Sequence, residues 1–188
     1  MSDKNPRNKI LTIPNILSFV RIGLIPFIMW LYLAKERYEA ALFVLIASGL
    51  TDVVDGFIAR RFNMISDFGK IIDPIADKLT QASVLFCLVF RFEYMLIPLI
   101  LLVVKEIYAG ITGLITVRIT GKVMSSLWHG KLATVLLYFT MAVHMIWFDI
   151  PYTVSLVLVA LCSAVMLASA VMYDIRNKRA LKEQKKTA

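Results

Sequence analysis

Apolar residues fill most of the chain in long runs, and short polar stretches separate these runs. The runs lie at residues 10–34, 40–50, 79–90, 94–104, 132–148 and 151–173. About 20 apolar residues in a helix can cross the roughly 30 Å hydrocarbon core of a bilayer. With their flanking residues, the runs predict helices at about 13–34, 39–61, 70–91, 94–117, 130–148 and 151–174. The pattern therefore predicts an all-α integral membrane protein with six transmembrane helices.

Composition supports a single membrane domain. The 188 residues are 59% hydrophobic with a mean hydropathy of +0.74, whereas soluble domains are about 45–50% apolar. We expect one domain over 1–188, with an interfacial N-terminal segment (1–12), a six-helix core (13–174) and a basic cytoplasmic tail (175–188). The first apolar run is too long for a signal-peptide core, so we expect it to be retained.

The net charge of +8 is distributed unevenly along the chain. Lysines and arginines gather at the N-terminus, near 60–70, near 118–131 and in the tail, whereas the other connections hold balanced charges or no base. With six helices, all four basic regions fall on one side of the membrane. The positive-inside rule then places both termini in the cytoplasm, in a bacterial-type cytoplasmic membrane. This distribution argues for topology signals and contact with membrane lipids, and against nucleic-acid binding.

Five aspartates interrupt the apolar pattern between residues 51 and 81. Asp52 and Asp55 fall near the end of the second predicted helix, and their i,i+3 spacing puts them on one face. Asp73 and Asp77 fall near the start of the third, on one face through i,i+4 spacing. The short connection predicts antiparallel neighbours, so these four carboxylates can converge near the cytoplasmic boundary. Asp67 lies in the connection, and we expect it to be a helix cap or a surface acid.

A cluster of carboxylates repels itself unless protons or cations neutralise it. Oxygen ligands without His or Cys favour hard divalent ions such as Mg²⁺ or Mn²⁺. Four acids can hold two such ions about 3.5–4 Å apart and clamp an in-line phosphoryl displacement. The alternative is that the acids pair with local bases, which are Arg60, Arg61, Lys70 and Lys78.

The residues between the aspartates suit phosphate binding. Gly56 and Ala59 are small and allow a ligand close to the backbone, and Arg60 offers a fork of donors. Gly69 opens the next predicted helix, where free N–H groups favour an anion. Together with the acids, these residues indicate a metal-bound diphosphate site at the membrane surface.

This spacing resembles the signature of the CDP-alcohol phosphotransferase (CDP-alcohol phosphatidyltransferase) family. The eight matching positions are Asp52, Asp55, Gly56, Ala59, Arg60, Gly69, Asp73 and Asp77. The stretches at 13–26 and 69–79 also resemble the phosphatidylglycerophosphate synthase and cardiolipin synthase branches. The resemblance implies six membrane helices, a homodimer, and an active site open to the cytoplasm.

The resemblance also implies a role for each matching residue. Asp52, Asp55 and Asp73 would bind the two divalent ions, and Asp77 would be a ligand or near-ligand and the general base. Gly56, Ala59, Arg60 and Gly69 would shape the pocket for the CDP-lipid, with Thr51 and Asp52 beside it. An alcohol would attack the phosphorus of CDP-diacylglycerol that carries the lipid, and CMP would leave.

The acceptor alcohol is less strongly indicated. The segment 105–122 and the stretch "GKLAT" (130–134) resemble acceptor-binding regions of phosphatidylglycerophosphate synthases. They imply Lys105, Arg118 and Lys131 as contacts for glycerol 3-phosphate. Ala133 replaces a usual lysine, however, and Lys105 replaces a usual arginine. A cardiolipin synthase that uses phosphatidylglycerol, or an enzyme for serine or inositol-type acceptors, is the alternative.

Simpler interpretations remain for several polar residues. Arg118 and Lys131 can be topology anchors, Lys105 can pair with Glu106, and Arg21 can either snorkel to headgroups or reach the site. We expect polar-edge or core positions for His129 and His144, core positions for Cys87 and Cys162, and interfacial positions for Trp30, Trp128 and Trp147. An ion-coupled transporter and a membrane prenyltransferase are further alternatives. A transporter of this kind would more often show repeated halves in its sequence, and a membrane prenyltransferase would show two aspartate-rich motifs far apart.

Overall fold

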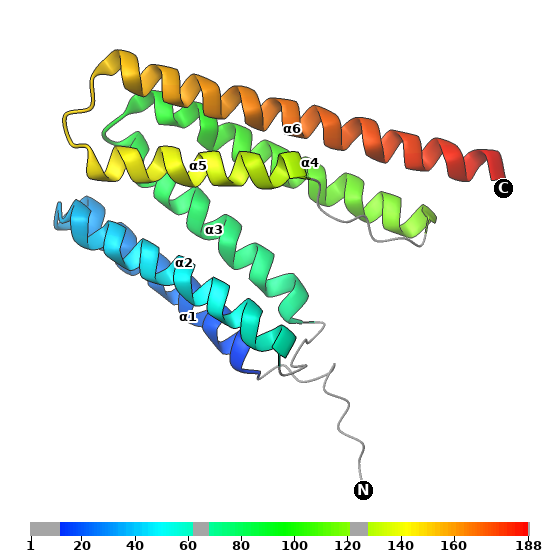
Figure 1. Cartoon of the computed structure of the whole chain (residues 1–188), viewed down its shortest axis with the longest axis horizontal. Helices are drawn as coiled ribbons and strands as arrows, with labels where there is room; N and C mark the ends of the chain where they lie inside the picture. Colours follow the sequence, from blue (N-terminus) through cyan, green and yellow to red (C-terminus); the bar gives the residue numbers. More distant parts are fainter. Residues whose placement is uncertain (1–11, 62–67, 121–127, 188) are drawn as a thin grey trace, which may run out of the picture. The chain divides into compact units, whose positions relative to one another are not determined.

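The computed structural model describes residues 12–61, 68–120 and 128–187, and the regular structure of this part is entirely helical (Figure 1). The helices are α1 (Ile13–Met29), extended by the π-helical turn η2 (Trp30–Ala34), α2 (Tyr38–Arg61), α3 (Gly69–Val89), the 3-10 turn η3 (Glu93–Met95), α4 (Leu96–Thr120), α5 (Trp128–Ile146) and α6 (Tyr152–Thr187). The prediction of six helices is confirmed for the described residues. Asp67 and, apart from Thr12, the expected interfacial segment lie outside them.

The first helix starts where the sequence places a capping residue. Thr12 has an extended backbone, and its hydroxyl accepts a hydrogen bond from the N–H of Asn15 at 3.4 Å. A proline follows in the first turn, where its missing N–H costs nothing. These local signals explain why the predicted start at residue 13 agrees with the structure.

The last helix is longer than predicted. Hydropathy ends the sixth predicted helix at residue 174, whereas α6 continues to Thr187. Residues 174–187 contain no glycine or proline and include four lysines, two arginines and one each of alanine, leucine, glutamate and glutamine, which are all strong helix formers. The hydropathy pattern marks the end of the apolar segment, and the helix continues beyond it because its propensity stays high.

Among the described residues, three helical stretches are long and apolar enough to cross a membrane, namely Asn15–Ala34, Glu93–Ile119 and Tyr152–Arg179. The apolar part of α2 is shorter, at Tyr38–Thr51, and the aspartates follow it directly. In α3 the carboxylates occupy the first turns. Six membrane crossings therefore remain a prediction, since α2, α3 and α5 do not reach the same length and hydrophobicity.

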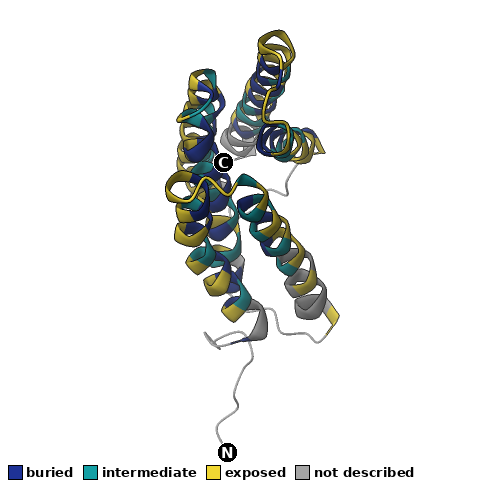
Figure 2. Ribbon diagram, turned by 90° about the vertical axis from the view of Figure 1, so that its left-hand side faces the viewer, coloured by how far each residue is buried: buried dark blue, intermediate teal, exposed yellow. Residues whose placement is uncertain are grey.

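Buried and exposed residues alternate around the helices (Figure 2), and many of the exposed side chains are apolar whereas several of the buried ones are polar. Phe43 is 74% exposed, Leu114 69% and Phe90 68%. Soluble monomers rarely expose apolar surface on this scale. Conversely, Gln81 and Thr140 are fully buried. This distribution suits a chain whose outer surface faces lipid and whose helices pack through polar contacts.

The described helices form two compact units, divided near the end of α3. In the first (Met1–Cys87), α1 and η2 pack along α2, and Tyr32 and Tyr38 meet edge to face with ring centroids 4.8 Å apart. Phe68, directly before α3, stacks with Phe19 of α1 at a centroid distance of 6.0 Å. The start of α3 therefore lies against α1.

In the second unit (Leu88–Ala188), α6 packs against both α4 and α5. Near one end of α5, the buried imidazole of His144 lies 2.7 Å from the carbonyl oxygen of Thr140 and 2.5 Å from the hydroxyl oxygen of Ser155 on α6. Towards the other end, Nδ1 of His129 lies 3.1 Å from Ser169 Oγ, also on α6. Both histidines are core residues, as expected, and they join α5 to α6.

Candidate functional site

The four predicted metal ligands lie on two consecutive helices of the first unit. Asp52 and Asp55 belong to the second half of α2, and Asp73 and Asp77 belong to the first half of α3. The side chains of Asp52 and Asp55 lie outside the described part of the structure. The same holds for the side chains of Ala59 and Arg60 and for the surroundings of Gly56, which are three predicted pocket residues.

The two carboxylates of α3 are half-buried, and each accepts a hydrogen bond from a fully buried side chain. Asp73 accepts through Oδ1 from the hydroxyl of Ser18 on α1. Asp77 accepts through Oδ2 from Nε2 of Gln81, one turn later on α3, at 3.0 Å. A carboxylate has two oxygens and about four acceptor positions, so one such hydrogen bond does not use up the acceptor capacity of the group.

Helix α1 contributes a polar face that sequence reasoning missed. Asn15 is 1% exposed, Ser18 0% and Arg21 2%, and their spacing of three residues keeps them near one side of the helix. Burial of the whole Arg21 side chain argues against the alternative that it snorkels to the headgroups. A buried guanidinium is stable only beside acceptors or negative charge. The available signal was the sequence itself, in which three polar residues recur at helical spacing in an apolar run.

Two further predicted pocket residues are described. Gly69 is buried and is the first residue of α3, as predicted. Thr51 is half-buried in α2, and its hydroxyl donates to the carbonyl oxygen of Ser48 at 2.6 Å. That bond uses the hydroxyl proton of Thr51, so Thr51 can meet a ligand through its oxygen lone pairs.

A divalent metal is consistent with the donors that are described. Asp73 and Asp77 offer only oxygen, which is the donor type that Mg²⁺ and Mn²⁺ prefer. Within the described residues, no three His, Cys, Asp or Glu side chains form a group that could hold a metal ion. The side chains of Asp52 and Asp55 lie outside the described part of the structure, so the convergence of four carboxylates remains a prediction.

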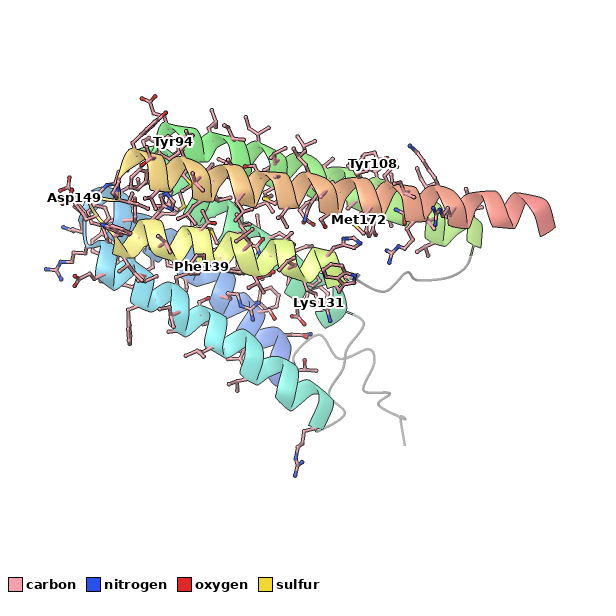
Figure 3. The ribbon with its side chains drawn as sticks, turned by 45° about the horizontal axis from the view of Figure 1, so that its top comes forward. Tyr94, Tyr108, Lys131, Phe139, Asp149 and Met172 are labelled. Atoms are coloured by element: carbon pink, nitrogen blue, oxygen red, sulfur yellow. The ribbon has the colours of Figure 1, made fainter. Side chains whose placement is uncertain are left out.

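The three candidate acceptor residues differ in their surroundings. Nζ of Lys105 lies 2.8 Å from Oε1 of Glu106, so these neighbours form the ion pair that was the simpler interpretation. Arg118 is exposed in the last turn of α4. Lys131 is exposed near the start of α5 (Figure 3). Ala133 is 2% exposed and packs inside the second unit. Arg118 and Lys131 are therefore more available to an anion than Lys105.

A second polar cluster joins α4 to α6, and Tyr108 is its labelled member in Figure 3. The hydroxyl of Tyr108 donates to Asp174, and Nζ of Lys178 lies 2.6 Å from the other oxygen of Asp174. Nearby, Nδ2 of Asn177 donates to Thr112 Oγ1 at 3.3 Å. Periodicity alone does not indicate these contacts, because they depend on the rotation of two helices about their axes.

The remaining expectations concern residues outside the candidate site. Cys87 and Cys162 are free and buried, as expected for core residues. Trp30 is 48% exposed, Trp128 70% and Trp147 48%, so all three indoles lie at the surface. Their placement at a membrane interface remains a prediction.

Comparison with known proteins gives a consistent result. A family model described as CDP-alcohol phosphatidyltransferase matches residues 11–173, a range that spans both compact units. A cardiolipin synthase (CMP-forming) of Streptomyces coelicolor is 44% identical over 89 residues, which cover 45% of this chain and 41% of that protein. A CDP-diacylglycerol–glycerol-3-phosphate 3-phosphatidyltransferase of Rickettsia bellii is 38% identical over 97 residues, covering 50% of this chain and 53% of that protein.

The human cardiolipin synthase (CMP-forming) is 38% identical over 108 residues, or 57% of this chain and 35% of that protein. The chain thus spans about half of the length of these curated relatives, or less. Relatives that are named for two different activities therefore match comparable lengths of this chain.

Proposed function

The chain belongs to the CDP-alcohol phosphatidyltransferase family, and we propose that it transfers a phosphatidyl group from CDP-diacylglycerol to an alcohol and releases CMP. The observation that carries this proposal is the placement of the signature residues. All eight fall on α2 and α3, consecutive helices of one compact unit. The two described acids, Asp73 and Asp77, lie one turn apart among buried polar side chains.

The reaction is a displacement at phosphorus. The alcohol oxygen bonds to the phosphorus that carries the diacylglycerol, and the bond from this phosphorus to the bridging oxygen of the diphosphate breaks. The electron pair of that bond leaves with CMP. Asp77, which accepts a hydrogen bond from Gln81 through Oδ2, takes the proton of the attacking hydroxyl. Positioning and charge stabilisation supply most of the catalysis in such transfers.

Asp52, Asp55, Asp73 and Asp77 are the proposed ligands of two Mg²⁺ or Mn²⁺ ions. Members of this family use divalent metals generally. Bound ions would neutralise the negative charge of the diphosphate and of the departing phosphate. Gly56, Ala59, Arg60, Gly69 and Thr51 are the proposed pocket for the CDP-lipid, because small residues admit the nucleotide and Arg60 suits a phosphate.

We propose glycerol 3-phosphate as the acceptor, with phosphatidylglycerophosphate as the product. Arg118 and Lys131 support this choice, since both are exposed cations on helices that follow the aspartate pair. The Rickettsia relative also carries the name of this activity.

Phosphatidylglycerol is the second candidate acceptor and would make the chain a cardiolipin synthase. Two observations favour it. Lys105 is paired with Glu106, and the buried methyl group of Ala133 offers no charge, so a free phosphate has fewer cationic partners. The Streptomyces and human relatives are named for this activity.

An acceptor panel separates these candidates. The purified full chain receives CDP-diacylglycerol and Mg²⁺ with glycerol 3-phosphate, phosphatidylglycerol, serine, inositol or no alcohol, and lipid products are identified by mass spectrometry. Phosphatidylglycerophosphate formed only with glycerol 3-phosphate supports the first candidate. Cardiolipin formed with phosphatidylglycerol alone would replace it with the second. A chain that binds no cytidine nucleotide would instead favour a transporter or a prenyltransferase.

We further propose a single six-span membrane domain with both termini and the active site on the cytoplasmic side, acting as a homodimer. The exposed apolar helix faces support insertion in a membrane. The clustering of basic residues in alternate connections supports the orientation.

A further inference from the structure

The described part of the proposed site contains two bonds that the reaction does not explain. Ser18 donates to Asp73, and Gln81 donates to Asp77. Both donor residues are 0% exposed, and neither belongs to the eight signature positions. Ser18 comes from α1, which is 55 residues away from Asp73 in sequence. A contact over this separation depends on how α1 and α3 pack.

The packing of α1 against α3 is supported by a separate contact. Phe19, the neighbour of Ser18, stacks with Phe68 at the start of α3, with centroids 6.0 Å apart. This contact between two apolar rings helps to set the position of α1 along its axis relative to the start of α3. The Ser18 hydroxyl therefore meets Asp73 beside a second side-chain contact, which joins α1 to the residue just before α3.

Gln81 is held from two sides. Its Nε2 donates to Asp77, and its Oε1 accepts from Nζ of Lys78 at 3.4 Å. This arrangement determines which end of the amide faces the carboxylate, because the ammonium group can only donate. Asp77 thus meets a donor whose orientation is set by another residue.

We propose that Ser18 and Gln81 are positioning residues that hold the carboxylates of Asp73 and Asp77 in the orientation that binds divalent cation. This inference rests on the proposed function, since it assigns these acids to the metal site. A bond to one oxygen of a carboxylate restricts its rotation and so helps to fix the direction of both oxygens. Removing such a supporting group typically lowers metal affinity or activity by about 10- to 100-fold.

The test measures Mn²⁺ binding to the full chain in detergent, without substrate, from the spin-resonance signal of free Mn²⁺. Ser18→Ala and Gln81→Leu should each raise the dissociation constant by about 10- to 100-fold. Ser18→Thr keeps a hydroxyl and should restore most of the affinity. Ser163→Ala on α6 is the matched control, because Ser163 is also a buried serine but lies on a helix without signature residues.

Turnover adds an independent readout. Gln81→Leu should lower kcat more than it changes KM for the alcohol, because Asp77 also receives the proton. Thermal unfolding of the metal-free variants should stay close to that of the unaltered chain.

The outcomes distinguish the inference from the proposed function. If the unaltered chain binds Mn²⁺ and Ser18→Ala and Gln81→Leu bind it equally well, the positioning role is wrong and the proposed function stands. If Ser18→Ala lowers affinity only together with metal-free stability, and Ser18→Thr fails to restore it, Ser18 is merely structural and the inference fails. If the unaltered chain binds no divalent ion, both the inference and the metal-dependent mechanism are wrong.

Discussion

Replacement of Asp77 by asparagine tests the proposed general base. Asparagine has nearly the same shape as aspartate, and its carbonyl oxygen can still accept the bond from Gln81, which measures 3.0 Å in the structure. The variant therefore keeps the local packing of α3. It loses the negative charge and the basic oxygen that would receive the proton of the alcohol.

The expected magnitude follows from the role of a general base. Such a group contributes about 10²- to 10⁴-fold to a rate, equivalent to about 3–5 kcal/mol of activation free energy. We expect kcat of Asp77→Asn to fall by this factor. Binding of the CDP-lipid should change much less, because Asp52, Asp55 and Asp73 would still hold metal.

The assay compares single-turnover CMP release with equilibrium binding of CDP-diacylglycerol in the presence of Mg²⁺. Asp73→Asn serves as the control, since a pure metal ligand should lose binding and turnover together. If Asp77→Asn loses lipid binding as strongly as Asp73→Asn, Asp77 is mainly a ligand. If it retains near-normal turnover, the proposed proton transfer is refuted.

Three further predictions address the metal, the acceptor site and the core. Chelation of divalent ions should abolish CMP release and added Mg²⁺ or Mn²⁺ should restore it, and activity that survives chelation would contradict the two-metal proposal. Lys131→Gln should raise KM for glycerol 3-phosphate by about tenfold or more, since a charge-assisted bond is worth about 1.5–3 kcal/mol. Lys105→Gln should raise this KM less, because Lys105 pairs with Glu106. Equal effects of the two variants in steady-state kinetics would refute this distinction. His144→Ala should lower the free energy of unfolding by about 2–4 kcal/mol, because it removes the contact to Ser155 and leaves a buried hydroxyl unpaired. A loss of less than about 0.5 kcal/mol, measured by denaturant unfolding in detergent, would argue against that contact.

The sequence predicted the helices well because two simple signals coincide. Apolar runs set where helices lie, and Gly69 was expected to open α3; the cap of α1 by Thr12 was recognised only in the structure. The end of α6 was not predicted, since hydropathy cannot distinguish a polar helix from a polar loop. The number of membrane crossings is also not determined by periodicity where carboxylates interrupt a run.

Spacing in the sequence led to the proposed ligands, which stay a prediction, whereas the side chains that donate hydrogen bonds to Asp73 and Asp77 were missed. Asp73 and Asp77 follow from spacing within one helix, which sequence displays directly. Ser18 depends on the rotation and level of α1 against α3, and no local pattern encodes that contact. The burial of Arg21 likewise follows from tertiary packing, so the sequence alone left its position open.

The most direct test of the central claim is the stoichiometry of CMP release. The purified full chain is mixed with CDP-diacylglycerol and Mg²⁺, with and without the acceptor identified in the panel, and CMP and phosphatidylated alcohol are quantified together. The proposed transfer predicts one CMP for each phosphatidylated alcohol, and negligible CMP when the alcohol is omitted. CMP release at the same rate without the alcohol, or no CMP under any condition, would contradict phosphatidyl transfer by this chain.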